Sequence, residues 1–310
     1  MATPSETEST IEEALEQTHF GKFNYLIILF TGLTFQNVVF ECMSLSFALP
    51  LLECELVLSH NKRGILCAIC FIGMIVCSHF WGFMADTMGR KSIMRPALFV
   101  GFAITTVSSF SPNFESLMVL RFLTGCALAA PASIAYSYLG EFHDQKYRNR
   151  AILSASFITA FLVIFFPIYA WAFINMKWKI YIPILNIMYK PWRLYIMVCG
   201  FTGLMCGIGL TFLPESPKYL LAKGKPENAI EVLKYMHHVN TKHFKALSKV
   251  EFKIHTSVCI QHLEISTFHH SIALETIAAI LLLINSYAIG KLGSKTILCK
   301  FFQREKGLTR

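Results

Sequence analysis

Three polar side chains lie close together in the first long apolar block of the sequence. Gln36, Asn37 and Glu41 fall between residues 24 and 50, where most neighbours are apolar. An ionisable group inside such a block suggests a functional site, because apolar surroundings do not stabilise its charge. Glu41, with the two amides, could face a central cavity and bind a solute or a coupling proton. The alternative is that Glu41 lies near the outer end of its block and is hydrated.

A second set of polar residues forms a motif between two apolar blocks. The chain reads Gly82-Phe-Met-Ala-Asp86-Thr-Met-Gly89-Arg90-Lys91. Gly82 permits two helices to approach closely, and Gly89 permits a sharp turn. Asp86 is placed to accept bonds from the N-terminus of a neighbouring helix, while Arg90 and Lys91 hold the loop at the membrane surface. Each of the five motif residues occurs at a frequency of roughly 5–7%, so the probability of finding all five by chance at a given starting position is about one in a million. The motif is therefore specific.

Residues typical of catalysis or metal binding do not form a set in the sequence. Cys67 and Cys70 have the CxxC spacing of some metal sites, but within an apolar block we expect them to be small packing residues. The histidine pairs 237–238 and 269–270 lack further ligands at suitable spacing. With no nucleophile triad, metal cluster or phosphate loop, the sequence predicts neither an enzyme nor a bound metal or cofactor.

The composition indicates which elements position these side chains. The chain of 310 residues is 54% hydrophobic and 15% charged, with a mean hydropathy of +0.50, whereas a soluble domain is about 25% charged. The sequence shows no strand-like alternation, and open sheets do not cross lipid, so an all-α membrane protein in a lipid bilayer is expected. Apolar blocks near the ~20 residues that cross a bilayer lie at about 24–50, 64–85, 92–110, 117–140, 151–175, 193–213 and 272–290.

Lysine and arginine in the connections predict the orientation, since they favour the cytosolic side. With a cytosolic N-terminus, the inner segments up to residue 253 carry 15 of these residues and the outer connections carry six. Residues 1–23 are acidic and polar, lack a cleavable signal, and are expected to form a cytosolic tail. The net charge of +9 then reflects an inside-facing bias, and no nucleic-acid partner is expected.

The last apolar block breaks this charge pattern. A single crossing at 272–290 would place six basic residues of the tail at 291–310 outside. Either this block does not cross, or a span that should precede it is missing, and the second explanation is preferred. The stretch 214–271 is then a cytosolic loop, in which residues 226–236 form an amphipathic helix with proline near its start.

The motif at residues 82–91 resembles the signature of the major facilitator superfamily. Further matches follow in the family's order, and the sequence Pro191-Trp192-Arg193 narrows the resemblance to the synaptic vesicle glycoprotein 2 type, especially its insect-like relatives. The matching positions are Arg121 and Gly125 for the RxxxG motif, Glu141, Arg148 and Arg150 for the charge cluster after span four, and Pro214, Glu215, Ser216 and Pro217 for the PESP sequence of sugar and organic-ion porters.

The resemblance implies a fold and roles for these residues. Residues 24–213 are expected to form the six-helix N-terminal bundle of the major facilitator fold, with one extra hydrophobic helix at 272–290 that resembles the family's span eight. The motif residues are expected to act as a cytosolic gate that latches two halves together, with Asp86 acting through a helix of the second half. Arg121 is expected to fix the cytosolic end of its span in preference to binding substrate.

Several functions are compatible with these observations. The first is a transporter that moves a small organic solute or ion by alternating access, in the plasma membrane or an intracellular vesicle, here in a truncated form. The second is a non-transporting vesicle membrane protein that acts in trafficking or binding, and the third is an inactive isoform. The motif argues against a seven-span receptor. A lone half is expected to be poorly stable, or to pair with another copy or a full-length relative.

Overall fold

The structure, a computed structural model, covers most of the predicted bundle and the first part of the loop that follows it. The extra span expected at 272–290, the tail at 291–310 and the later part of the 214–271 loop lie outside the described residues. The described residues are 4–56, 59–174, 176, 178–183 and 187–241.

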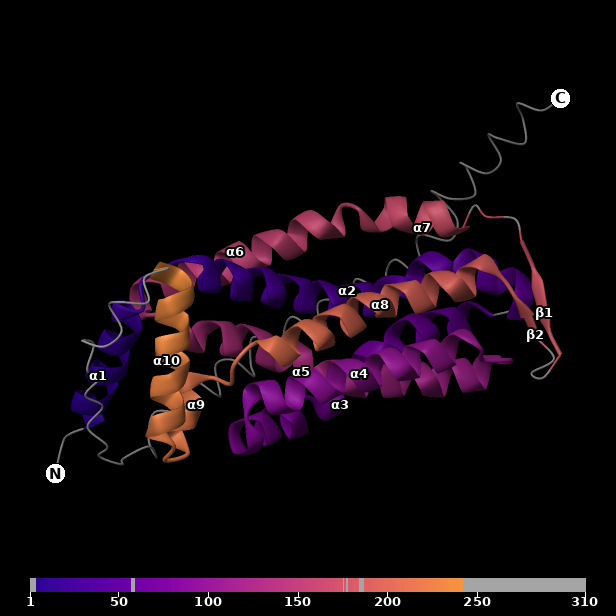
Figure 1. The fold of residues 1–310 in the computed structure, drawn as a ribbon. Coiled ribbons are helices and arrows are strands. Elements are labelled where there is room, and N and C mark those ends of the chain that lie inside the picture. Colours follow the sequence, from indigo (N-terminus) through magenta and orange to yellow (C-terminus); the bar gives the residue numbers. More distant parts are fainter. Residues whose placement is uncertain (1–3, 57–58, 175, 177, 184–186, 242–310) are drawn as a thin grey trace.

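Among the described residues, six helical stretches are long and apolar enough to cross a membrane, which confirms the expected membrane class and number of spans in the bundle. Figure 1 shows these helices running lengthwise beside one another. The elements are α2 (Lys22–Leu56), α3 (His60–Met88), α4 (Arg90–Ser109), α5 (Phe114–Glu141), α6 (Gln145–Val163) continued by α7 (Phe166–Ile174), and α8 (Pro191–Phe212).

The fifth span is interrupted between α6 and α7. Regular helix stops at Val163 and resumes at Phe166. Pro167, just inside α7, has no amide hydrogen to donate to the carbonyl of Val163, so the continuous helix expected over 151–175 cannot keep its hydrogen-bond ladder at this point.

Glycines permit a close backbone contact between α3 and α5. A Cβ atom added at Gly125 would lie 2.0 Å from the Cys70 carbonyl oxygen, and one added at Gly73 would lie 2.3 Å from the Phe122 carbonyl oxygen. Such separations are too short for any side chain, so both positions require glycine for the two backbones to meet.

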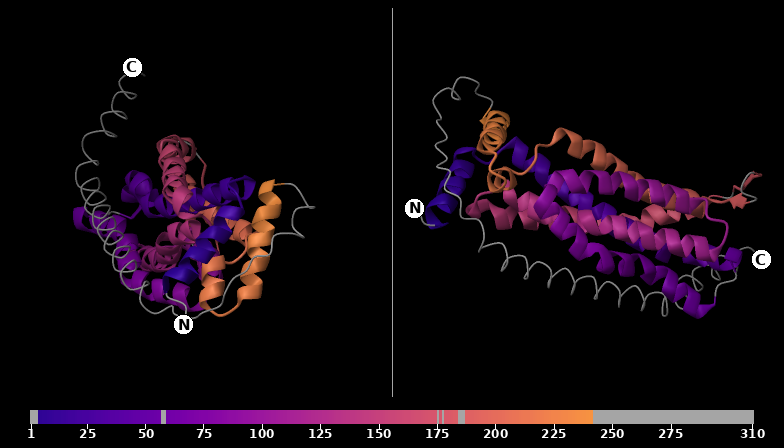
Figure 2. Two further views of the ribbon diagram at one scale, coloured as in Figure 1. Left: turned by 90° about the vertical axis from the view of Figure 1, so that its left-hand side faces the viewer. Right: turned by 90° about the horizontal axis from the view of Figure 1, so that it is seen from below.

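The helices outside the membrane spans gather at one end of the bundle (Figures 1 and 2). There α1 (Pro4–Gln17), α9 (Pro217–Ala222) and α10 (Pro226–Thr241) lie beyond the spans, with α10 crossing the direction of the bundle. The N-terminal segment expected as a tail therefore contains a helix, and the amphipathic helix expected to end at residue 236 continues to Thr241. At the opposite end, β1 (Ile180–Ile182) pairs antiparallel with β2 (Ile187–Tyr189).

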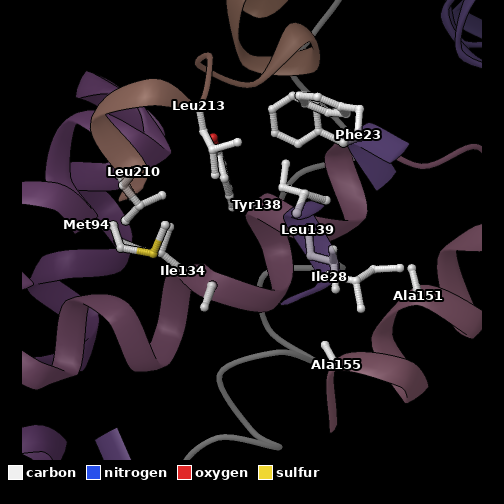
Figure 3. Packing of buried hydrophobic residues seen from close by; sticks show 14 of the residues in the cluster. Phe23, Ile28, Met94, Ile134, Tyr138, Leu139, Ala151, Ala155, Leu210 and Leu213 are labelled. Atoms are coloured by element: carbon white, nitrogen blue, oxygen red, sulfur yellow. The ribbon is translucent and has the colours of Figure 1, made fainter. Parts of the chain in front are cut away.

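An apolar core joins the spans to these end helices. Figure 3 shows Phe23 of α2, Tyr138 of α5 and Leu213 after α8 within one cluster, and none of them is more than 3% exposed. Leu233 and Met236 of α10 belong to the same cluster and are fully buried. The end helices are therefore packed onto the bundle by apolar contact, which contributes about 25 cal/mol per Å² of buried surface.

The orientation of this bundle stays a prediction that labelling can test. In a cysteine-depleted chain, Glu115→Cys at the exposed start of α5 should react with an impermeant thiol reagent added outside intact cells. Asn228→Cys, exposed on α10, should react only after the membrane is opened, because α10 belongs to the end predicted to be cytosolic. The reverse labelling pattern would contradict the orientation.

Candidate functional site

Glu41 and Arg121 form a fully buried ion pair between α2 and α5. Arg121 Nη1 donates to Glu41 Oε2 at 3.1 Å, and the two side chains are 0% and 2% exposed respectively. A charge buried in this way is costly unless a partner and hydrogen bonds compensate it. The ion pair supplies that partner and ties span one to span four.

Two further helices contribute to the same group. Arg121 Nη2 donates to Ser108 Oγ of α4 at 2.7 Å, and Nη1 also approaches Ser44 Oγ at 3.4 Å. On α8, a Cβ atom at Gly200 would lie 2.6 Å from Glu41 Oε1, so only glycine leaves room for the carboxylate. Arg121 Nε has no hydrogen-bond partner within the described residues, which leaves one buried donor unused.

The position of Arg121 corrects one expectation. It does not fix the cytosolic end of its span, because it lies beside Ser108, at the end of α4 opposite to the Gly89 turn. The expectation was wrong because span four begins at the end of the bundle where α4 ends, and not at the end that carries the Gly89 turn. Glu41 is likewise buried, with 2% of its side chain exposed.

The two amides near Glu41 face different neighbours. Asn37 Oδ1 accepts a hydrogen bond from Thr202 Oγ1 of α8 at 2.8 Å, so Asn37 and Glu41, four residues apart, both contact α8. Gln36 is rotated by about 100° around the helix. It is 3% exposed, and neither its amide oxygen nor its nitrogen has a partner among the described residues. The structure therefore joins Asn37 and Glu41 along α8 and leaves Gln36 apart.

Arg90 connects the loop motif with the charge cluster after span four. Its guanidinium lies 2.8 Å from Asp86 Oδ1 and 2.9 Å from Glu141 Oε1, and it also donates to the Ala85 carbonyl at 3.1 Å. Gly89, which precedes it, has φ of 106°, a conformation that favours glycine. The sharp turn predicted at Gly89 is confirmed, and Gly82 lies upstream on α3.

The carboxylate at the start of α4 is Glu215 and not Asp86. Glu215 accepts bonds from Lys91 N at 3.0 Å, Ser92 N at 3.2 Å and Ser92 Oγ at 3.2 Å, which satisfies amides that the helix itself leaves free. Asp86 is bonded to Arg90, four residues along the chain. The motif carboxylate was expected to meet a helix N-terminus, and the PESP segment supplies that group instead.

The PESP segment is fixed by further bonds. Lys91 Nζ donates to the carbonyls of Thr211, at 3.1 Å, and Leu213, at the end of α8. Tyr138 donates its hydroxyl to the Pro214 carbonyl at 2.5 Å. Ser216 caps α9 by accepting from the Tyr219 amide, and Pro217 occupies the first turn of that helix.

Glu12 of α1 is a site residue that sequence reasoning missed. It accepts bonds from Gln145 N at 2.9 Å, Arg148 Nη2 at 2.6 Å and Lys218 Nζ at 2.5 Å. Burial alone would raise the pKa of Glu12, but Lys218 and Arg148 outweigh it and lower the pKa below its ordinary value. The available signal was the acidic N-terminal stretch beside an inner surface rich in lysine and arginine. Arg150 is exposed and lies outside this group.

A matching group of charges lies at the opposite end of the bundle. Arg193 of α8 donates to the carbonyls of Ser109, at 3.0 Å, and Ser111, at 2.6 Å, where α4 ends. Arg193 also lies 3.1 Å from Glu55 Oε1. Burial would raise the pKa of Glu55, but bonds from Trp192, Lys190 and Arg193 lower it. The Pro191-Trp192-Arg193 sequence therefore secures the C-terminal end of α4.

Known proteins share both the sequence and the fold. The family described as Sugar (and other) transporter matches residues 21–283. Synaptic vesicle glycoprotein 2B of Mus musculus is 27% identical over 241 residues, which are 77% of this chain and 35% of that protein. Synaptic vesicle glycoprotein 2A of Homo sapiens is 29% identical over 238 residues, 74% of this chain and 31% of that protein. The chain thus spans about a third of the length of these curated relatives.

Solved transporters have the same helix arrangement. The xylose transporter XylE from E. coli, in a partially occluded inward-open conformation, matches with a TM-score of 0.60 and 17% identity over 87% of this chain and 70% of that chain. A bacterial homolog of the human lysosomal transporter Spinster matches with a TM-score of 0.55 and 12% identity over 88% of this chain and 75% of that chain. At these identities the likeness shows the fold alone.

Breaking the buried pair should destabilise the bundle strongly. Arg121→Ala leaves the Glu41 carboxylate buried without a partner, which typically costs about 3–5 kcal/mol. We expect a clear fall in the thermal midpoint of detergent-solubilised protein, measured by fluorescence-detected size exclusion. Glu16→Gln, on exposed α1 surface, serves as the control. The charge-reversed double variant, Glu41→Arg with Arg121→Glu, should recover part of the loss, and equal midpoints for all variants would refute the assignment.

Removing the Glu12 charge should loosen α1. Because the folded pKa of Glu12 is lowered, its contribution is complete at pH 7 and is lost only as the pH falls through that lowered value. Glu12→Gln should therefore speed hydrogen exchange in α1 several-fold at pH 7, whereas Glu13→Gln, on the exposed face, should not. Unchanged exchange in Glu12→Gln would show that apolar contacts alone hold α1.

Proposed function

Because the chain belongs to the Sugar (and other) transporter family, we propose that it forms one six-helix half of a transporter for a small organic solute or ion. Transport would proceed by alternating access, without covalent chemistry. In such proteins the solute lies near the bilayer midplane, between two halves that rock against each other. The described bundle supplies one wall of that arrangement.

The observation that carries the proposal is the ion pair between Glu41 and Arg121. A buried carboxylate and guanidinium within membrane spans are expensive to maintain and mark a solute or proton pathway. Four spans contribute to this group, so a change in its protonation or bonding acts on all four. Asn37, which lies one turn before Glu41 on α2 and is bonded to Thr202 of α8, offers an amide that a polar solute could share.

The charged residues at the end of the spans support the proposal that this region is a gate and not a substrate site. Asp86, Arg90 and Glu141 lie at the end of the spans next to α9 and α10, away from the Glu41 pair. Asp86 keeps 36% of its side chain exposed, so its carboxylate is open to a further donor. We propose that this donor comes from the second half when the cytosolic side closes, with the N-terminus on that side.

The bundle by itself is proposed not to transport. The solute site of the family needs walls from both halves, and a lone half would leave polar groups such as Gln36 without partners in lipid. We propose that it pairs with a second half, another copy or a full-length relative, in the plasma membrane or an intracellular vesicle.

One comparison favours a second candidate function. The curated relatives are named synaptic vesicle glycoproteins, so the chain could act in vesicle trafficking or binding without moving a solute. Transport assays on a protein that holds both halves separate the two proposals. If the proteins bind vesicle components but no tested solute crosses, the binding role is favoured.

A vesicle assay tests the transport proposal. We expect proteoliposomes that contain residues 1–310 alone to take up sugars, organic cations and carboxylates no faster than empty vesicles. A protein that joins these residues to a second six-helix half should show saturable uptake, which Glu41→Gln abolishes. Saturable uptake by residues 1–310 alone would contradict the requirement for two halves, and no uptake by the two-half protein would contradict a transport function.

The gate assignment predicts a uniform effect on substrates. In the two-half protein, Asp86→Asn should slow the transport of every substrate by a similar factor, because the residue lies far from the bilayer midplane where solutes bind. Initial rates for two unlike substrates provide the measurement, with Asp144→Asn as a control carboxylate at the same end. A change in the ratio of the two rates would place Asp86 in substrate selection instead.

A further inference from the structure

The sulfur atom of Cys42 lies close to two sulfur atoms of a neighbouring helix within the buried core. Cys42 Sγ of α2 is 3.6 Å from Cys70 Sγ and 3.3 Å from Met74 Sδ, and the latter two belong to α3. Both cysteines are free thiols, 4% and 2% exposed. Cys70 and Met74 are four residues apart and share one face of α3. The proposed transport function uses none of these atoms.

We propose that this sulfur cluster, formed by Cys42, Cys70 and Met74, binds a soft monovalent metal ion, Cu(I) or Ag(I). Thiolate and thioether sulfur are the ligands that such ions prefer, whereas hard ions such as Mg²⁺ take oxygen. Three sulfurs at roughly 2.3 Å from one ion in a plane lie roughly 4 Å apart. The separations of 3.6 Å and 3.3 Å between Cys42 Sγ and the other two sulfurs therefore need to widen by only about half an ångström, which the flexible Met74 side chain can absorb.

The two thiols are held in place by neighbouring contacts. Gly125 of α5 lies so near the Cys70 carbonyl that a Cβ there would be 2.0 Å from it, which fixes α3 at this turn. Cys42 directly follows Glu41, whose carboxylate is bonded to Arg121, and that bond fixes α2. Because both backbones are locked by contacts outside the cluster, little ordering is needed when an ion binds.

A metal ion explains the third sulfur better than a disulfide does. A disulfide requires an S–S distance of about 2.05 Å, so the thiols would have to move together by about 1.5 Å between two fixed backbones. Met74 contributes nothing to that bond but is a ligand to a soft ion. In the sequence, Cys67 and Cys70 have the CxxC spacing of some metal sites. In the structure, the thiol that Cys70 contacts within the sulfur cluster is that of Cys42.

Binding is a ligand exchange without electron transfer. The Cys42 thiol loses its proton to the solvent as its sulfur bonds to the ion, and Cys70 and Met74 act as neutral donors. One thiolate with one monovalent ion gives a neutral complex, which buried surroundings favour over a charged one. One proton is therefore released for each ion bound.

The test uses Ag(I), which does not oxidise thiols, added to the purified chain in detergent micelles. A competing soft chelator is included so that only the tightest site fills. We expect one bound ion and one released proton per chain. Removing a residue that only hydrogen-bonds a metal ligand typically weakens metal binding by about tenfold or more. Cys42→Ser removes a ligand itself and should weaken silver binding by more than about tenfold. Met74→Leu should weaken silver binding less than Cys42→Ser does. Cys206→Ser, a thiol of α8 that is 3% exposed, should leave it unchanged.

Retention of tight binding in Cys42→Ser, or an equal loss in Cys206→Ser, would overturn the proposal. Thiol counting that shows a Cys42–Cys70 disulfide and no bound silver would do the same. If Cys42→Ser fails to fold, mass spectrometry of the unchanged chain decides. Ag(I) should then protect Cys42 and Cys70, but not Cys206, from a small membrane-permeant alkylating reagent, and equal modification of all three would refute the site.

Discussion

The carboxylate of Glu41 imposes the constraint on which the arrangement of the spans depends. A charge that cannot reach water must be neutralised where it lies, so α5 must bring Arg121 to it within 3.1 Å. The guanidinium in turn needs acceptors, and Ser108 of α4 provides one. Gly200 of α8 must lack a side chain to admit the carboxylate. One buried charge thereby fixes the register of four helices, and the proposed solute or proton pathway is centred on it for that reason.

The ends of α4 show a second consequence of placing helices in lipid. Glu215, after α8, accepts from the amides at the start of α4, and Arg193, at the start of α8, donates to the carbonyls where α4 ends. Each charge has the sign that the helix dipole favours at that terminus. Arg193 lies at the start of α8 and Glu215 follows its end. Because each of them bonds to one end of α4, the two helices are locked at both ends and behave as one unit. A rigid pair of this kind suits the rocking motion proposed for the bundle.

The charged residues at the end of the spans next to α9 and α10 are bonded mainly to one another and to neighbouring backbone groups. Glu12 joins α1, α6 and α9, and Arg90 joins the loop motif with Glu141 of α5. These contacts include backbone amides and carbonyls, whose positions are set by the helices themselves. Asp86 keeps 36% of its side chain exposed and so stays open to a further donor. This arrangement is consistent with a gate that closes by adding a few bonds to a preformed cluster.

The sequence alone determined the membrane class, the six spans and the family, because hydrophobic length and the Gly82–Lys91 motif are local properties of the chain. It also predicted the need for glycine at Gly89. It could not decide which carboxylate meets the start of α4, since Asp86 and Glu215 are equally plausible until the path of the PESP segment is known. It placed Arg121 at the wrong end and missed Glu12 and the contact of Cys42 with Cys70. Those features join residues 28 to 206 positions apart, and only the packing of helices against one another brings such residues into contact.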